Sequence, residues 1–391
     1  MRDVLMKALL KKITLILIGL AMIIGAALVS PALHEIGLSY PDADPALLPL
    51  LVTLPSLTLL LGLVISSVLS SKVAAKPLIL LGLLLILVSG VLPAFLHDLT
   101  LIILLRGILG VGLGMIMPLQ MTLFAQYPEK ERSVLIGCNS AVNCVIGVFF
   151  IALAGKLALN DWHLIFYLYA IFLPILLAAV LFIPYERPSA SEKTASSGQG
   201  AKLPKEIFVY CGFVAVGMVT FYVILTNMAF YLNDHQLGNA AVVGMLTAAG
   251  TAGSAAGAFL MPWLERLLKQ YAAPITMAFM AVGFVLLIQT QTVVTVGAGY
   301  VLQSFCQGAF GCLITFKFTQ MVALEKVSAA TSCYMGTVFS SQFLAPYLML
   351  GLQTLPGLGT MRAVFGLYAV VMVVVSAVFL LVVRRQSRQS A

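Results

Sequence analysis

Leu104-Leu-Arg-Gly-Ile-Leu-Gly-Val-Gly-Leu-Gly-Met-Ile-Met-Pro118 is an apolar run that carries one arginine and four glycines. On a helix with 100° between residues, Gly107, Gly110 and Gly114 share one stripe, and such small residues let a neighbouring helix approach closely. Arg106 points within about 40° of Gly110. An arginine in hydrocarbon costs at least about 2.5 kcal/mol, so we expect Arg106 to face the protein interior and to be needed for function and not for folding. The alternative is a snorkelling arginine near a helix end.

The composition is that of an integral membrane protein. Hydrophobic residues make up 61% of the 391 residues and charged residues 9%, with a mean hydropathy of +1.07. Soluble domains carry about 25% charged residues, so a soluble fold is excluded. The apolar segments are about 20 residues long, which suits membrane-spanning helices and is too long for the strands of a barrel.

Twelve such segments are predicted, and a polar linker rich in Ser, Gly, Lys and Glu divides them into two groups of six. Their approximate ranges are 13–33, 46–69, 77–96, 99–124, 134–157, 163–183, 207–232, 240–264, 274–289, 296–322, 329–352 and 361–383. Six helices, a linker and six helices is the layout of a duplicated transporter. We therefore predict a six-helix bundle over residues 1–184, a cytoplasmic linker over 185–204 and a second six-helix bundle over 205–391.

The net charge of +8 is distributed unevenly over the predicted loops. Lys and Arg gather on the side that holds the N-terminus, whereas the opposite loops carry only Lys156 and Arg362. By the positive-inside rule both termini are predicted to be cytoplasmic, in the inner or plasma membrane. The positive charge then reflects topology and does not indicate nucleic-acid binding.

The two halves resemble each other at an offset of roughly 198 residues. The matching pairs are Arg106–Gly114 with Ser304–Cys312, His34-Glu35 with Asp234-His235, and Glu131-Arg132 with Glu325-Lys326. The second copy of the opening run lacks the arginine but keeps polar residues at Gln303 and Gln307, which we take as candidate substrate contacts. We also expect the two halves to meet at glycine-lined contacts, including the pairs Gly110/Gly114 and Gly253/Gly257.

Several motifs resemble the major facilitator superfamily of membrane transporters. Arg106-x-x-x-Gly110-x-Gly112 matches its fourth helix, and Tyr127-Pro-Glu-Lys-Glu-Arg132 with Gly137 matches the start of its fifth. Asp161-Trp-His-Leu-Ile-Phe166 matches the residues that lead into its sixth helix. Ser30-Pro-Ala-Leu33 resembles the end of the first helix in its drug-efflux branch. The resemblance implies an all-α membrane protein with twelve transmembrane helices in two pseudo-symmetric bundles. It also implies transport by alternating access.

The gating loops of that family are only partly kept. The loop after the second helix usually reads Gly-x-x-x-Asp-x-x-Gly-Arg-Lys, and the acid, both glycines and the arginine are missing here. The candidate gating residues are Lys72 and Lys76 in this loop and Glu265, Arg266 and Lys269 in its counterpart. Asn143-Cys144 stands where the family's antiporters have Gly-Pro, which leaves the direction of transport open.

Polar residues inside two other segments are candidate substrate contacts. Asn139 and Asn143 lie four apart on one helix face and either bind a ligand or form interhelical hydrogen bonds. In the segment 207–232, Tyr222, Asn227 and Tyr231 form either a substrate wall or part of the core.

Lys317 lies about five residues from the end of its segment, where a lysine can snorkel to the interface. Alternatively, Lys317 and Arg106 form an anion site, since the middle of the membrane contains no acid to balance them. A transporter of cationic drugs would place an acid there, so this pattern argues against such a substrate.

Each histidine lies beside an acid near the end of a segment. Glu35 and Asp234, with His34 and His235, are the candidates for proton coupling, and helix caps or solvated ends are the alternative. Adjacent residues rarely ligate one metal ion together, so no metal site is expected. The chain contains no spacing typical of catalytic residues or a phosphate loop, so we expect neither a cofactor nor an enzyme.

These patterns favour proton-linked export of a small amphipathic or drug-like molecule by a monomer in the lipid bilayer. One alternative is an organic-anion transporter that uses Arg106 and Lys317. The other is a membrane receptor or scaffold that transports nothing.

Overall fold

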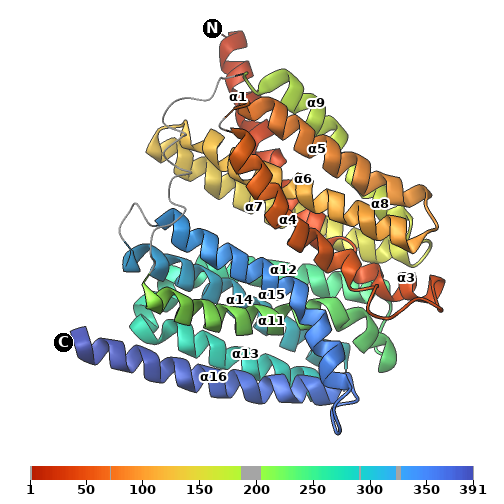
Figure 1. The fold of residues 1–391 in the computed structure, drawn as a ribbon, viewed down its shortest axis with the longest axis vertical. Helices are drawn as coiled ribbons and strands as arrows, with labels where there is room; N and C mark the ends of the chain where they lie inside the picture. Colours follow the sequence, from red (N-terminus) through yellow and green to blue (C-terminus); the bar gives the residue numbers. More distant parts are fainter. Residues whose placement is uncertain (1, 71, 186–203, 290–291, 323–326, 391) are drawn as a thin grey trace. The chain divides into compact units, whose positions relative to one another are not determined.

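The computed structural model describes residues 2–70, 72–185, 204–289, 292–322 and 327–390 (Figure 1). The first part of the chain forms α1 (Arg2–Ile18), α2 (Leu20–Ala27), η1 (Ser30–Ala32), α3 (Leu33–Ser39), α4 (Leu50–Ser70), α5 (Ala75–Val91), η2 (Leu92–Phe95), α6 (Leu99–Ala125), α7 (Glu129–Ala158), α8 (Leu164–Tyr167), η3 (Leu168–Ile171) and α9 (Phe172–Phe182). The second part forms α11 (Lys205–Asp234), α12 (Ala240–Leu268), η4 (Lys269–Tyr271), α13 (Ala272–Gln289), α14 (Val293–Met321), α15 (Val327–Gln353) and α16 (Met361–Ser390). These ranges contain no strand, so the predicted all-α class is confirmed.

The chain divides into two compact units, Met1–Ser197 and Gly198–Ala391, which we call the N-terminal unit and the C-terminal unit. Each unit contains six of the predicted segments. Most of the predicted linker 185–204 lies outside the described residues, so its boundaries stay a prediction. Glu325-Lys326, one member of the third repeat pair, also lies outside them.

Nine stretches of the described chain are long and apolar enough to cross a membrane. Eight of them hold one predicted segment each, and Ala240–Gln289 holds two, α12 and α13. The two remaining predicted segments, 296–322 and 329–352, coincide with α14 and α15. The chain is therefore a multi-pass membrane protein, and each of its predicted segments is helical.

Helix α6, which contains the opening run, packs against both α4 and α5 in the N-terminal unit (Figure 1). Its glycines make this close packing possible. A Cβ atom added to Gly110 would collide with the Pro55 carbonyl of α4, and one added to Gly114 would collide with the Leu59 carbonyl of the same helix.

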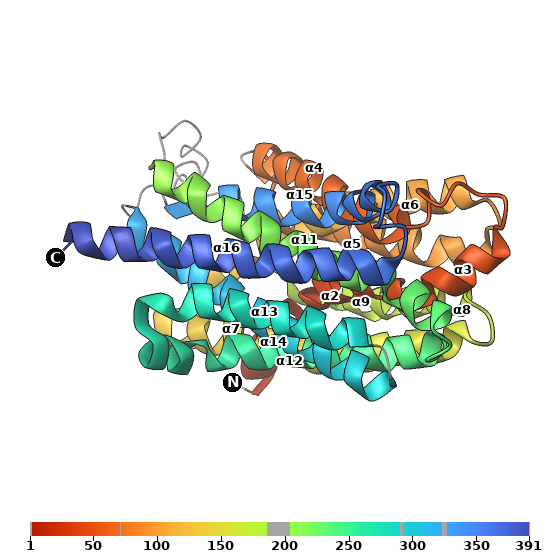
Figure 2. The ribbon, with the colours of Figure 1, turned by 90° about the horizontal axis from the view of Figure 1, so that it is seen from below.

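The C-terminal unit is built in a similar way, with α14 packed against α12 and α13 (Figure 2). A Cβ atom on Gly257 of α12 would collide with the Phe305 carbonyl of α14, and one on Gly253 would press on Val301. The expectation that these glycine pairs join the two halves is therefore wrong. Small residues bring helices together inside each unit, because van der Waals packing is the main attraction available in lipid.

Gly114→Ala is expected to lower the melting temperature of the protein, because its methyl group has to displace the backbone of α4. Overpacking of this kind costs about 1–3 kcal/mol, which outweighs the gain in helix propensity. Gly107→Ala on the same helix is the matched control, since its Cβ would make an ordinary 3.4 Å contact with Leu54. Thermal unfolding of both variants in detergent measures the difference, and equal melting temperatures would contradict the packing argument.

Candidate functional site

Arg106 lies completely buried in the N-terminal unit, where each of its three side-chain nitrogens donates a hydrogen bond. Nε donates to the Leu51 carbonyl of α4 at 2.7 Å, one terminal nitrogen to the Tyr169 hydroxyl of η3 at 2.7 Å, and the other to the Gly25 carbonyl of α2 at 2.9 Å. The Tyr169 hydroxyl in turn donates to the Ile24 carbonyl at 3.2 Å. Arg106 thus ties α6 to three other segments.

This geometry decides between the two interpretations of Arg106. A snorkelling arginine would expose its head group, so that alternative is wrong. All three acceptors are uncharged oxygens, and a buried charge is tolerated only when its donors are satisfied in this way. The hydrogen bonds lead us to expect that Arg106 also stabilises the fold, contrary to the expectation from the sequence, because removing it would leave three buried acceptors without a donor. A direct contact between Arg106 and a substrate stays a prediction.

Three carboxamides surround Gly19, the residue between α1 and α2. Gln120 Nε2 donates to the Leu15 carbonyl at 2.7 Å and to Asn139 Oδ1 at 3.1 Å. Gln120, Asn139 and Asn143 are 4%, 7% and 8% exposed. Asn139 therefore forms an interhelical hydrogen bond, whereas Asn143 Oδ1 is buried without a partner in the part of the chain that the structure describes.

A cavity of about 680 Å³ opens in the C-terminal unit between α11, α12, α14 and α15. Two predicted contacts, Tyr222 and Gln307, lie in its wall. The full lining is Met218, Phe221, Tyr222, Ser254, Ala258, Met261, Gln307, Gly308, Gly311, Cys312, Thr315, Phe316, Tyr334 and Met335. These residues include aromatic rings, three methionines and one carboxamide, but none of them is charged.

The other predicted contacts of this unit lie elsewhere. Asn227 donates to the Val223 carbonyl of its own helix at 2.9 Å. The Tyr231 hydroxyl is fully buried and donates to the Leu287 carbonyl of α13 at 2.7 Å. Tyr231 therefore belongs to the core, whereas Asn227 is half-buried and bonds within its own helix, so its contact with a substrate stays a prediction.

Gln303 and Lys317 on α14 also lie outside the cavity wall. Gln303 is fully buried, and neither atom of its amide has a partner among the described residues. Lys317 is exposed at the C-terminal part of α14, as a snorkelling lysine would be.

Several residues of both sites were not predicted from the sequence. Gln120 lies two residues beyond the opening run, and a lone amide in an apolar helix was the available signal. Met218, Ser254 and Tyr334 reach the cavity from three different helices, and such residues are common in helix cores.

Comparison with known proteins identifies the family. A sequence model of the Major Facilitator Superfamily matches residues 15–288. The chain belongs to the Major Facilitator Superfamily. No curated protein sequence matches the chain.

Solved structures similar to this chain are also transporters. A bacterial homolog of the human lysosomal transporter Spinster has 15% identity and a TM-score of 0.74, with 97% of each chain covered. A peptide transporter in complex with sulfate has 12% identity and a TM-score of 0.76, with 97% of this chain and 95% of that chain covered. The xylose transporter from E. coli has 12% identity and a TM-score of 0.71, with 94% of each chain covered. At these identities the likeness shows the fold alone.

Membership in the Major Facilitator Superfamily makes this chain a membrane transporter of small molecules and points away from an enzyme. The family match does not extend to a branch, so the resemblance to drug-efflux proteins stays a prediction.

The candidate gating residues of this major facilitator protein lie at the ends of helices and in the loops between them. Lys76 Nζ donates to the Val180 carbonyl at the end of α9, at 2.6 Å. Lys72, Arg266 and Lys269 are exposed, and Lys269 has a positive φ of 50° where α12 ends. An ion pair that sequence analysis did not predict joins Lys12 of α1 to Glu131 of α7.

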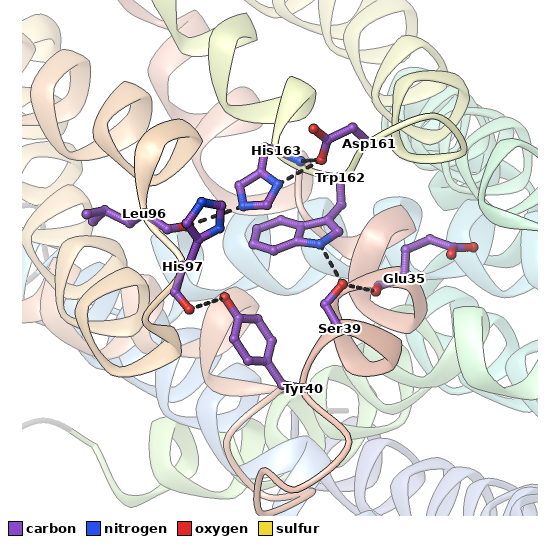
Figure 3. Close-up of polar contacts among 8 residues, drawn as sticks. All are labelled: Glu35, Ser39, Tyr40, Leu96, His97, Asp161, Trp162 and His163. Atoms are coloured by element: carbon purple, nitrogen blue, oxygen red, sulfur yellow. Dashed lines mark hydrogen bonds and ion pairs between the residues drawn. The ribbon is translucent and has the colours of Figure 1, made fainter.

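Near the end of α3 the N-terminal unit carries a polar cluster that Figure 3 shows. Its members, the α3-end cluster, are Glu35, Ser39, Tyr40, Leu96, His97, Asp161, Trp162 and His163. Trp162 Nε1 donates to Ser39 Oγ at 2.8 Å, and the Tyr40 hydroxyl donates to the His97 carbonyl at 2.8 Å. These bonds tie the end of α3 to the η2–α6 loop and to the α7–α8 loop.

The acids that neighbour histidines in the sequence do not all pair with them. Asp161 Oδ1 lies 2.7 Å from His163 Nδ1, so this pair forms. Asp98 instead caps α6 and accepts from the amides of Thr100 at 2.8 Å and Leu101 at 3.3 Å.

The proton-coupling candidates lie in the first turn of α3 and at the C-terminal end of α11. His34 and Glu35 are half-buried on α3, and Glu35 lines a cavity of about 540 Å³ at the α3-end cluster. Asp234 is exposed, and His235 Nδ1 lies 2.9 Å from the Tyr231 carbonyl.

Asp161 is expected to stabilise the protein at neutral pH and to lose this effect in acid. The backbone amide of His163 donates to its carboxylate at 2.9 Å and holds the pKa of Asp161 below its usual value of 3.8. A lowered pKa stabilises the fold above the usual value, and the effect disappears as the pH falls through the folded value, below about pH 4. Melting temperatures of wild type and Asp161→Asn should differ at pH 7 and converge in acid; a pH-independent difference would contradict this role.

Proposed function

We propose that this protein is a secondary transporter that exports a small, uncharged amphipathic molecule in exchange for protons. The observation that carries the proposal is the cavity of about 680 Å³ in the C-terminal unit, whose lining, among the residues that the structure describes, contains no charged side chain. Small-molecule sites have volumes of about 300–1,000 Å³ and combine apolar walls with a few polar groups.

The chemistry of the lining supports the proposed class of substrate. The rings of Phe221, Tyr222 and Tyr334 offer apolar area, while Gln307 offers one amide for orientation. Gln307 Nε2 lies 3.2 Å from the Met218 sulfur, and Gln307 Oε1 has no partner in the described structure. A ligand with one hydrogen-bond donor on an apolar body would match this wall. Methionines adapt to ligands of different shape.

The organic-anion alternative is less well supported. The nitrogens of Arg106 already donate to protein oxygens, and Lys317 does not line the cavity. An anion would therefore have no unengaged cation in the cavity wall to pair with.

The direction, coupling and location belong to the same proposal. Export is supported by the resemblance of Ser30–Leu33 to the drug-efflux branch. Proton coupling rests on Glu35 and Asp234, each next to a histidine. The charge distribution supports an inner or plasma membrane protein with cytoplasmic termini, and we propose that it works as a monomer in lipid.

Tyr222→Ala is expected to weaken binding of a neutral amphipathic ligand by about tenfold or more, because burying an aromatic side chain contributes about 1.5–3 kcal/mol. A thermal-shift screen of purified protein against neutral, anionic and cationic compounds first selects the ligand. Phe279→Ala is the control, since Phe279 is 52% exposed on α13 and does not line the cavity. Equal loss of affinity in both variants, or stabilisation by anions alone, would contradict the proposed site.

A further inference from the structure

The regular hydrogen-bond ladder of the first membrane segment is interrupted at Gly19, between α1 and α2, although the Gly19 backbone keeps helical dihedral angles (φ −62°, ψ −21°). In a regular helix the Gly19 amide would donate to the Leu15 carbonyl, four residues back. Here it donates to the Ile16 carbonyl at 3.1 Å, three residues back, and the Leu15 carbonyl is released. Gln120 of α6 instead donates a hydrogen bond from Nε2 to the Leu15 carbonyl at 2.7 Å.

Gly19 is also the point around which the three carboxamides gather. A Cβ atom at Gly19 would lie 2.7 Å from Asn143 Nδ2 and 2.9 Å from Gln120 Nε2, and it would collide with Asn139 Oδ1. The amides of Gln120 and Asn143 are therefore near neighbours across the interrupted helix. Asn143 Oδ1 is nine-tenths buried and has no donor in the described structure.

These observations define a second arrangement with the same number of hydrogen bonds. If the Gly19 amide returned to the Leu15 carbonyl, the helix would become continuous and Gln120 Nε2 would lose that acceptor. The same nitrogen could then donate to Asn143 Oδ1 while keeping Asn139 Oδ1. An exchange that conserves hydrogen bonds costs little free energy, which is what a two-state element requires.

We propose that Gln120 is a positioning residue that switches the first membrane segment between an interrupted and a continuous helix during transport. Gln120 holds the interrupted state through Leu15, and Asn143 holds Gln120 in the continuous state. The proposal rests on the proposed transport function, but its first readout requires no substrate.

The test measures the distance across the interruption by electron spin resonance. Spin labels are placed at Leu9→Cys and Leu38→Cys, which are 58% and 64% exposed on α1 and α3, after the six native cysteines are replaced by alanine. Asn143→Leu removes the acceptor that only the continuous state uses, so it should shift the population toward the interrupted helix by about two- to tenfold, the effect of one net hydrogen bond. Gln120→Met removes two hydrogen bonds from each arrangement, so it should leave the population near that of wild type. In the double variant, Gln120→Met should abolish the effect of Asn143→Leu.

Thr122→Val is the matched control, because the Thr122 hydroxyl donates within its own helix, to the Pro118 carbonyl at 3.0 Å. It should leave the distances unchanged. In liposomes, Asn143→Leu should turn over at least about tenfold more slowly than wild type. If Gln120→Met does not fold, the shift in Asn143→Leu still tests the exchange. An unchanged distance in Asn143→Leu, or an equal shift when Gln120→Met is also present, would overturn the proposal even if transport is confirmed.

Discussion

Arg106→Ala is expected to destabilise the N-terminal unit by about 3 kcal/mol or more. The substitution leaves the Leu51 and Gly25 carbonyls and the Tyr169 hydroxyl without their donor, and each buried unsatisfied group costs about 1–3 kcal/mol. Relief from burying a charge offsets part of this cost. The melting temperature in detergent should fall by about 10 °C for a unit of this size.

Two further variants separate the parts of this network. Arg106→Lys keeps the charge but offers one nitrogen instead of three, so its melting temperature should lie between those of wild type and Arg106→Ala. Tyr169→Phe removes a single hydroxyl and should cost about 1–3 kcal/mol. A wild-type melting temperature in Arg106→Ala would contradict the structural role. A large loss of ligand affinity in a stable Arg106→Lys would instead support a direct substrate contact.

The double variant Glu35→Gln/Asp234→Asn is expected to abolish transport driven by a pH gradient while leaving passive exchange intact. A coupled proton needs a titratable group, and the apolar middle of the predicted segments contains no carboxylate. Glu35 lines the 540 Å³ cavity together with His97 and His163, so it is placed to exchange protons with water. Asp234 is exposed beside His235.

Flux in liposomes with and without an imposed gradient measures this effect for the double variant and for each single variant. Asp42→Asn is the control, because Asp42 is an exposed acid that follows α3 without lining the cavity. A full response to the gradient in the double variant would show that neither acid carries the proton.

The fold could be predicted because membrane-spanning helices need long apolar segments, and polar stretches separated them clearly. The interruption at Gly19 could not be predicted from the sequence. Ile18-Gly19-Leu20 has no turn signal, and the cause lies in Gln120, Asn139 and Asn143 on two other helices. The prediction of which helices the glycine pairs contact was wrong for a related reason. A small residue indicates that some helix approaches closely, but it does not indicate which helix.

The candidate site was predicted only in part. Tyr222 and Gln307 reach the cavity, whereas Tyr231 and Asn227 look equally suitable in the sequence and bond within the bundle. At 100° per residue, Asn227 and Tyr231 lie about 140° and 180° around α11 from Tyr222, so they face other neighbours. The partners of Arg106 are mostly backbone carbonyls, which every residue has, so the sequence contains no signal for them.

Counterflow in proteoliposomes measures directly whether the protein moves an uncharged amphipathic molecule across the membrane. The assay uses one labelled neutral amphipathic compound and an anionic analogue of the same size. We expect saturable flux of the neutral compound that Tyr222→Ala reduces and Phe279→Ala does not. Binding without flux would indicate a receptor, and flux of the anionic analogue alone would indicate an anion transporter; either result would contradict the proposed function.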